Sequence, residues 1–193
     1  TVTADIAASL GQSRPQGVLI NDIHPKGSAY KAGIRVGDVV LSVNGHVVND
    51  PRQLRFRIAT LPVGERATFA VLRRGRKLDL SVNLAAPPED PPRNATDLKG
   101  RHPLSGTRVA NLSPALADEL GLNTFGEGVI ILRLYRGAPA GRLGFRPGDV
   151  VRAINGKAVR SVGELKRILT QKGGRWVVTV QRNGKTLRLI IEG

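Results

Sequence analysis

Few residues of this sequence are arranged for catalysis. The three histidines, His24, His46 and His102, are scattered along the chain, whereas a triad or a metal site needs histidine close to carboxylates. The sequence has no G-x-S-x-G elbow, no phosphate-binding glycine loop and no H-E-x-x-H motif. It also lacks cysteine, which excludes disulfides and thiolate metal sites. We therefore expect no catalytic residue, metal or cofactor here, and surface positions for the histidines.

Two aspartates occupy matched positions. Asp38 and Asp149 each follow a glycine and precede a Val-Val pair. Two carboxylates brought together could act as acid and base, but each of these belongs to a different copy of a repeated stretch. An aspartate in a Gly-Asp turn can instead accept hydrogen bonds from backbone N–H groups. We predict that each aspartate stabilises a turn in its own domain.

The repeated stretch covers residues 33–45 and 144–156, at a constant offset of 111 residues. The glycines, the aspartate, the Val-Val pair and the Asn-Gly pair coincide in the two copies. This pattern predicts a short helix ended by glycine, a tight turn, a buried strand and an Asn-Gly hairpin. The long period indicates two copies of one domain rather than a solenoid, whose repeats run about 20–50 residues.

Each copy is followed by the same elements. Capping signals and apolar spacing predict helices over 51–61 and 162–172. Alternating apolar residues then predict strand pairs over 68–84 and 176–191. The expected fold class is α+β, mainly β: each domain is a small, partly open antiparallel barrel or sandwich with one longer helix and one or two short ones.

A proline-rich segment separates the copies. Residues 87–101 contain Pro88, Pro91 and Pro92 and few apolar residues, which is typical of an extended linker. The predicted domains are therefore residues 1–86 and 102–193. No signal peptide opens the sequence, and we expect the chain to be part of a longer protein. No apolar run is long enough for a transmembrane helix.

The net charge of +15 favours acidic partners in general. The basic residues are spread over both copies, and the densest cluster, at 73–77, lacks the interleaved aromatic residues that stack on bases. Nucleic acid is therefore not an expected partner. Weak contact with an anionic membrane surface is an open alternative.

The motifs of both copies resemble one family. Residues 27–45 read Gly-Ser-Ala-x-x-Ala-Gly-Ile-x-x-Gly-Asp-Val-Val-x-x-Val-Asn-Gly, and residues 137–156 read Gly-Ala-Pro-Ala-x-x-x-Gly-Phe-x-x-Gly-Asp-Val-Val-x-x-Ile-Asn-Gly. Both resemble the circularly permuted PDZ domains of HtrA/Deg-type (Do-like) bacterial serine proteases. The tandem arrangement is similar to that of the members with two PDZ domains after a protease domain.

This resemblance implies a function. The parent would be an exported, periplasmic quality-control endoprotease, with its catalytic triad in an upstream domain that is absent here. This chain would bind hydrophobic peptides of unfolded or C-terminally tagged substrates and gate protease assembly. Its other partners would be its own protease domain and sister subunits in a trimer or cage. The alternatives are a structural assembly module with no free groove, or a basic module that binds anionic surfaces.

The resemblance also implies a site. A PDZ domain pairs a peptide end with an edge strand beside a helix, and loop amides bind the terminal carboxylate. In the second copy the loop would be 104–107 and the edge strand 108–110, with Ser105 and Thr107 making the pocket more polar or shallower. In the first copy the loop is missing, so we expect an incomplete site there.

One wall of each groove would be the longer helix. Ile58 and Leu169 occupy matching positions and are favoured as the groove-facing residues. The peptide-binding residues expected from loop, strand and helix together are Leu104, Ser105, Gly106, Thr107, Arg108, Val109, Leu165, Ile168, Leu169, Leu54 and Ile58.

Overall fold

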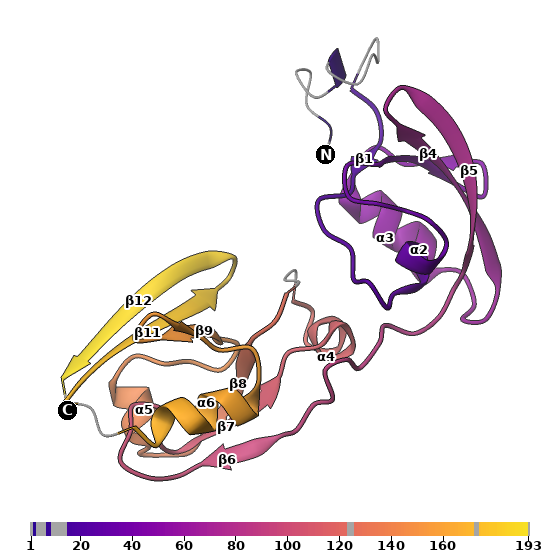
Figure 1. Ribbon diagram of the computed structural model, residues 1–193. Helices are drawn as coiled ribbons and strands as arrows, with labels where there is room; N and C mark the ends of the chain where they lie inside the picture. Colours follow the sequence, from indigo (N-terminus) through magenta and orange to yellow (C-terminus); the bar gives the residue numbers. More distant parts are fainter. Residues whose placement is uncertain (1, 3–6, 9–14, 123–125, 172–173, 193) are drawn as a thin grey trace. The chain divides into compact units, whose positions relative to one another are not determined.

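The computed structural model describes residues 2, 7–8, 15–122, 126–171 and 174–192. The chain divides into two compact units, Thr1–Pro88 and Glu89–Gly193 (Figure 1). Each contains one antiparallel sheet, and neither sheet closes into a barrel. The predicted mainly β fold class is therefore confirmed. No helix among the described residues has the length and apolar character needed to cross a membrane.

The first unit is built on a five-stranded sheet. Its strand order is β1-β2-β4-β5, and β3 pairs with β2. Its strands and helices are β1 (Val18–Leu19), α2 (Ser28–Lys31), β2 (Val39–Val43), β3 (His46–Val47), α3 (Pro51–Ala59), β4 (Arg66–Arg73) and β5 (Arg76–Asn83). The longer helix begins as predicted, because the Asp50 carboxylate accepts hydrogen bonds from the backbone N–H groups of Arg52 and Gln53.

The second unit repeats this order and, relative to the described part of the first unit, has β6, β7 and α4 at its start. The sheet order is β12-β11-β9-β8-β7-β6, and β10 pairs with β9. Its elements are β6 (Thr96–Leu98), β7 (Thr107–Asn111), α4 (Pro114–Glu119), β8 (Val129–Leu134), α5 (Pro139–Arg142), β9 (Val150–Ile154), β10 (Lys157–Ala158), α6 (Val162–Leu169), β11 (Arg175–Arg182) and β12 (Lys185–Glu192). Ser161 caps α6, as predicted, by accepting a hydrogen bond from the Glu164 N–H.

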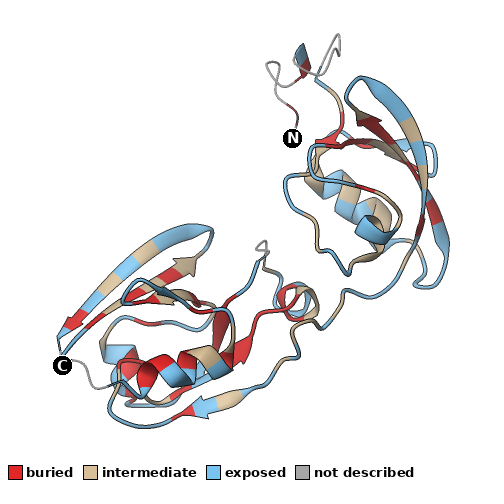
Figure 2. Cartoon of the chain, in the orientation of Figure 1, coloured by how far each residue is buried: buried red, intermediate tan, exposed pale blue. Residues whose placement is uncertain are grey.

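The longer helices of the two units are buried to different extents. In α3 no residue is buried, whereas α6 buries Val162, Leu165, Ile168 and Leu169 (Figure 2). The sequences explain this difference, because α3 carries Arg57 at the position that Ile168 occupies in α6. The apolar stripe of α6 is consequently wider and requires more cover.

The segment expected to form a linker lies largely inside the second unit. Residues 89–101 belong to that unit, and β6 within them pairs with β7. Leu98 is only 3% exposed. The Asn111 side chain also donates a hydrogen bond to the Pro92 carbonyl at 2.7 Å, and the Asn111 backbone N–H donates to the Arg93 carbonyl at 2.7 Å. The predicted linker therefore does not extend to residue 101, because Pro92, Arg93 and β6 are hydrogen-bonded to the rest of the second unit.

The duplicated aspartates stabilise turns, as predicted, and each also forms a buried ion pair. The backbone N–H of Arg146 donates to Asp149, which is 0% exposed. The Arg182 guanidinium donates to both carboxylate oxygens of Asp149, at 2.6 and 2.7 Å. In the first unit, Arg73 pairs with Asp38 in the same way. These arginines come from the hairpin strands β11 and β4, which the sequence did not connect with the turns.

The pKa of Asp38 reflects this environment. Burial by itself would raise the pKa, but the hydrogen bonds from the Arg73 side chain and the Arg35 backbone N–H outweigh burial and lower it below 3.8. The carboxylate is therefore charged at neutral pH, and its stabilising contribution is lost only as the pH falls through this lowered pKa.

Replacing Asp149 by alanine should destabilise the second unit by about 3 kcal/mol, because it leaves the largely covered Arg182 without its ion-pair partner. Urea unfolding followed by the fluorescence of Trp176, the only tryptophan, would report on this unit alone. Asp118→Ala, at an exposed position of α4, is the matched control. A loss no greater than that of the control would contradict the assigned role of the ion pair.

Candidate peptide-binding site

Strand β7 does not form an edge of its sheet. It pairs with β8 on one side and with β6 on the other. The prediction of an edge strand at 108–110 is therefore wrong, and β6 is the terminal strand of the sheet order. The pairing of β6 is antiparallel, with Thr96 opposite Val109, Asp97 opposite Arg108 and Leu98 opposite Thr107. The segment pairs with β7 because its Leu98 side chain is buried in the core. Leu98 is an apolar residue in a segment that was predicted to be a linker.

The predicted loop exists, but two of its amides are engaged by the chain itself. The N–H of Gly106 donates to the Leu98 carbonyl at 2.9 Å, and the N–H of Ser105 donates to the His102 carbonyl at 3.1 Å. Thr107 does not make the loop polar in the expected way, because its buried hydroxyl donates to the Leu104 carbonyl at 2.8 Å. The amides of Ser105 and Gly106 therefore bind carbonyl oxygens of the chain itself.

Gly106 is required by the geometry of this loop. Its φ is +77°, which is in the left-handed region. A Cβ atom at this position would lie 2.5 Å from the Cβ of Ala138, closer than two carbon atoms can approach. The loop therefore packs against the start of α5 in a way that only glycine permits.

The predicted pocket residues of the second unit form one apolar cluster. Leu104, Val109 and Leu165 are fully buried in it, and Leu98 belongs to the same cluster. Ile168 and Leu169 are buried there too. Arg108 is on the opposite, exposed face of β7 and forms an ion pair with Asp97, with 3.8 Å between nitrogen and oxygen.

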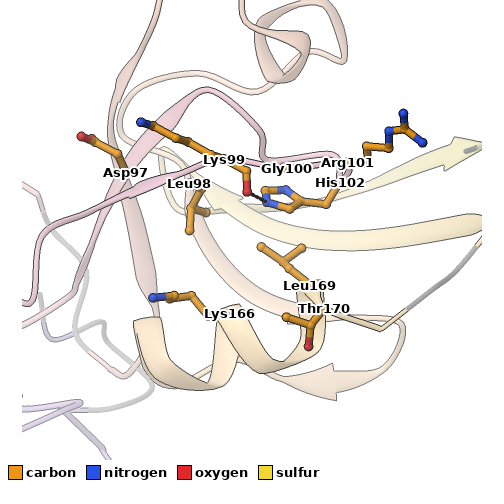
Figure 3. Close-up of a pocket in the computed structure, with 9 residues that line it drawn as sticks. All are labelled: Asp97, Leu98, Lys99, Gly100, Arg101, His102, Lys166, Leu169 and Thr170. Carbon is orange, nitrogen blue, oxygen red and sulfur yellow. Dashed lines mark hydrogen bonds between the residues drawn. The ribbon is translucent and has the colours of Figure 1, made fainter.

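A hollow remains between β6 and the second half of α6. Its volume is about 360 Å³. In Figure 3 the side chains of Leu98, His102 and Leu169 face one another across this space, while the charged ends of Lys99 and Arg101 point away. The lining residues are Asp97, Leu98, Lys99, Gly100, Arg101, His102, Lys166, Leu169 and Thr170. Of the predicted helix residues, Leu169 is thus the one that borders open space.

His102 is more deeply placed than the surface position expected for it. Its Nε2 atom lies 3.2 Å from the Lys99 carbonyl oxygen, which can only accept, so Nε2 is the donor. Its Nδ1 atom is buried and has no partner among the described residues. Burial lowers the pKa of His102 below 6.5, against the opposing effect of the backbone hydrogen bonds. His24 is likewise half-buried, and His46 is exposed.

In the first unit, the predicted helix residues are more accessible. Leu54 and Ile58 of α3 are half-buried and pack against the core of this unit. Phe56 is 66% exposed on the other side of the helix. Thr1, which was expected to lie at the end of the pairing strand, is outside the described residues, so the expectation of an incomplete site in the first unit remains a prediction.

Three residues that hold β6 in place were not predicted, namely Leu98, Asp97 and Tyr135. The Tyr135 hydroxyl donates to the Asp97 carboxylate at 3.0 Å, and Leu98 is buried. The signal was weak, because three residues are too few to show an alternating pattern. The Thr-Asp-Leu sequence does contain a β-branched residue and an apolar residue on one face of a strand.

Comparisons with known proteins agree with this geometry. The PDZ domain family matches residues 4–84 and again residues 130–182. A probable periplasmic serine endoprotease DegP-like from Brucella suis biovar 1 (strain 1330) is 32% identical over 186 residues, covering 93% of this chain and 35% of that protein. The periplasmic serine endoprotease DegP of Escherichia coli (strain K12) is 26% identical over 191 residues, covering 99% and 37%.

Among solved structures, the crystal structure of the HtrA3 PDZ domain bound to a phage-derived ligand is 23% identical, with a TM-score of 0.40, and covers 45% of this chain and 80% of that one. The two family matches show that the chain belongs to the PDZ domain family and carries two such domains. It is similar to part of the DegP-type endoproteases and spans about a third of the length of these relatives.

Gly106→Ala should destabilise the second domain by about 2–4 kcal/mol, since it combines an unfavourable positive φ with a clash against Ala138. Gly163→Ala provides the matched control, because this glycine lies within α6, has no close neighbour and has a helical backbone. The control should be neutral or stabilising by up to about 1 kcal/mol. Equal effects of the two substitutions in urea unfolding would contradict the assigned constraint.

The second domain should also lose stability as the pH falls below about 6.5. The folded state lowers the pKa of His102, so the unfolded state binds more protons in the window between the lowered pKa and 6.5. Unfolding followed by Trp176 fluorescence at pH 7 and at successively lower pH would measure this loss. His102→Gln cannot be protonated and should flatten the profile over the same window. An unchanged profile would show that His102 is not the group responsible.

Proposed function

We propose that this chain is the peptide-binding and regulatory PDZ pair of a periplasmic serine endoprotease. It binds extended hydrophobic segments of unfolded or C-terminally tagged proteins and gates the assembly and activity of the protease. The names of the relatives, all periplasmic serine endoproteases, support the location and the parent activity. We place the catalytic residues of the parent in a domain other than these two, and its sister subunits among the partners.

The accessible apolar face of α3 is the observation that carries this proposal. Leu54 and Ile58 are half-buried, while Leu165 and Leu169 at the matching positions of the second domain are buried. A segment laid along α3 could therefore cover apolar surface that the first domain leaves accessible to water. In a PDZ groove, strand pairing of the backbone supplies affinity and side-chain pockets supply specificity.

A single short strand buries a small interface, so the expected affinity is weak, roughly micromolar to millimolar. Two PDZ domains in one chain can compensate when one long substrate contacts both, since the second contact becomes intramolecular. Unfolded polypeptides suit this mode, because they offer several extended apolar segments.

The structural alternative is favoured, for the second domain, by one observation. The β7 edge that would receive a peptide is already paired with β6. A domain in this state would contribute to packing between subunits rather than to substrate capture. The basic-surface alternative has no comparable feature in its favour, because Arg73, within the densest basic cluster, forms an ion pair with Asp38.

The test is a titration of the chain with a labelled apolar peptide, made as the free acid and as the C-terminal amide. Ile58→Glu should weaken binding at least about tenfold, because it places a charge on the surface that the peptide would cover. Phe56→Glu is the matched control, with the same added charge on the exposed side of α3. Stronger binding of the acid would indicate recognition of a carboxylate.

Equal effects of Ile58→Glu and Phe56→Glu on peptide affinity would contradict the proposal for the first domain. Failure of the unaltered chain to bind either form of the peptide would favour the structural alternative instead.

A further inference from the structure

We propose that β6 is a resident internal ligand of the second PDZ domain. The groove it fills would then select an internal extended segment with one large apolar side chain, rather than a free C-terminus, and such a segment must displace β6 to bind. This inference rests on the proposed peptide-binding function and specifies the ligand class and the regulation of the second domain.

The strand β6 pairs with β7 as an added peptide strand would. Such a peptide forms main-chain hydrogen bonds along an otherwise free strand edge. The β6 segment does this on β7, with an antiparallel register over Thr96–Leu98. On its other side β6 has no partner strand among the described residues, since it ends the sheet order. It therefore has the pairing of a bound peptide, although it is part of the same chain.

The loop amides are engaged by backbone carbonyls. The Gly106 N–H donates to the Leu98 carbonyl of β6 at 2.9 Å, while the Ser105 N–H is used within the loop itself and donates to the His102 carbonyl at 3.1 Å. Both acceptors are neutral peptide oxygens, and the chain continues beyond Leu98 through Gly100, whose φ of +126° turns it away. This arrangement accepts a chain that passes through the groove, whereas a carboxylate would have to displace both carbonyls.

Leu98 anchors β6 in the apolar cluster. Its side chain is 3% exposed and belongs to the same cluster as Leu104, Leu165 and Leu169. In Figure 3 it points toward α6. The neighbouring Thr96 and Asp97 are half-buried and exposed, respectively. Only one side chain of β6 is therefore buried in the groove, and it is a large aliphatic one.

The strand β6 itself is short and makes few side-chain contacts, which favours its exchange. Besides its pairing with β7, the Gly106 bond and the buried Leu98, it is fixed by the Tyr135 hydroxyl and by the ion pair of Asp97 with Arg108. The preceding residues Pro92 and Arg93 are held separately by Asn111. The hollow of about 360 Å³ beside it leaves space between β6 and α6. A competing segment binds only the fraction of molecules in which β6 is released, so its apparent affinity rises as this fraction rises.

The test uses a peptide that copies residues 94–100, as free acid and as amide, and a version with aspartate in place of the leucine. Binding is measured through the NMR shifts of the Gly106 and Thr107 amides. Leu98→Ala weakens the resident strand, and the leucine peptide should then bind at least about tenfold more tightly than to the unaltered chain. The aspartate peptide should not bind, and the acid and amide forms should bind equally.

A locked variant provides the opposite perturbation. Asp97→Cys with Arg108→Cys places two thiols at directly opposed positions of β6 and β7. The natural sequence has no cysteine, so within the chain these thiols can bridge only to each other. The oxidised variant should lose binding of the leucine peptide, and reduction should restore it. Asp118→Ala, in the same domain and away from β6, should behave as the unaltered chain.

If Leu98→Ala does not fold, Asp97→Ala decides the question, because it removes the two side-chain contacts of Asp97 without changing the apolar cluster. The proposal is overturned if neither variant binds the leucine peptide better than Asp118→Ala does. It is also overturned if the oxidised lock binds as well as the reduced form, or if the acid binds tenfold better than the amide. Failure of the proposed function itself would be seen separately, as peptide binding that is insensitive to Ile58→Glu in α3.

Discussion

Each domain depends on one buried carboxylate whose hydrogen-bond partners come from distant parts of the chain. The Asp149 oxygens accept bonds from the Arg182 guanidinium and from the Arg146 backbone N–H, and Arg182 also donates to the Gly144 carbonyl at 2.8 Å. Asp38, Arg73, Arg35 and Gly33 repeat this arrangement in the first domain. A buried charge is tolerated only with such complete pairing. The pair therefore fixes the end of the short helix, the turn and the hairpin strand relative to one another.

This constraint extends to the groove through the backbone. The Asp149 carbonyl accepts from the Ile131 N–H, and the Gly148 N–H donates to the Ile131 carbonyl, both at 2.8 Å. These bonds attach β8 to the turn, and β8 in turn sets the position of β7. The first domain has the equivalent bonds between Ile20 and the turn at Asp38. In the second domain the groove edge is thus placed by this turn, whatever then occupies it.

The parts predictable from sequence were those encoded by local pattern. The duplicated glycine turn, the caps at Asp50 and Ser161 and the closing hairpins follow from short-range chemistry and are present in the structure. The role of Leu98 was not predictable, because a three-residue strand has no period and its pairing depends on distant partners. The same reason applies to the partners of the aspartates, since a cluster of basic residues does not reveal which arginine reaches a turn about 35 residues away in sequence.

A few side chains give the longer helices of the two domains different degrees of burial. In α3, arginine at position 57 narrows the apolar stripe, so the helix can remain half-covered at modest cost. In α6, Ile168 at the matching position widens the stripe, and leaving it open would expose a large apolar patch. Pairing β6 onto β7 covers the cluster around α6 with Leu98, a residue from the start of the second domain. In our proposal, a groove with an internal cover binds its target more weakly but is protected from non-specific association, whereas the half-covered α3 stays accessible to an extended chain.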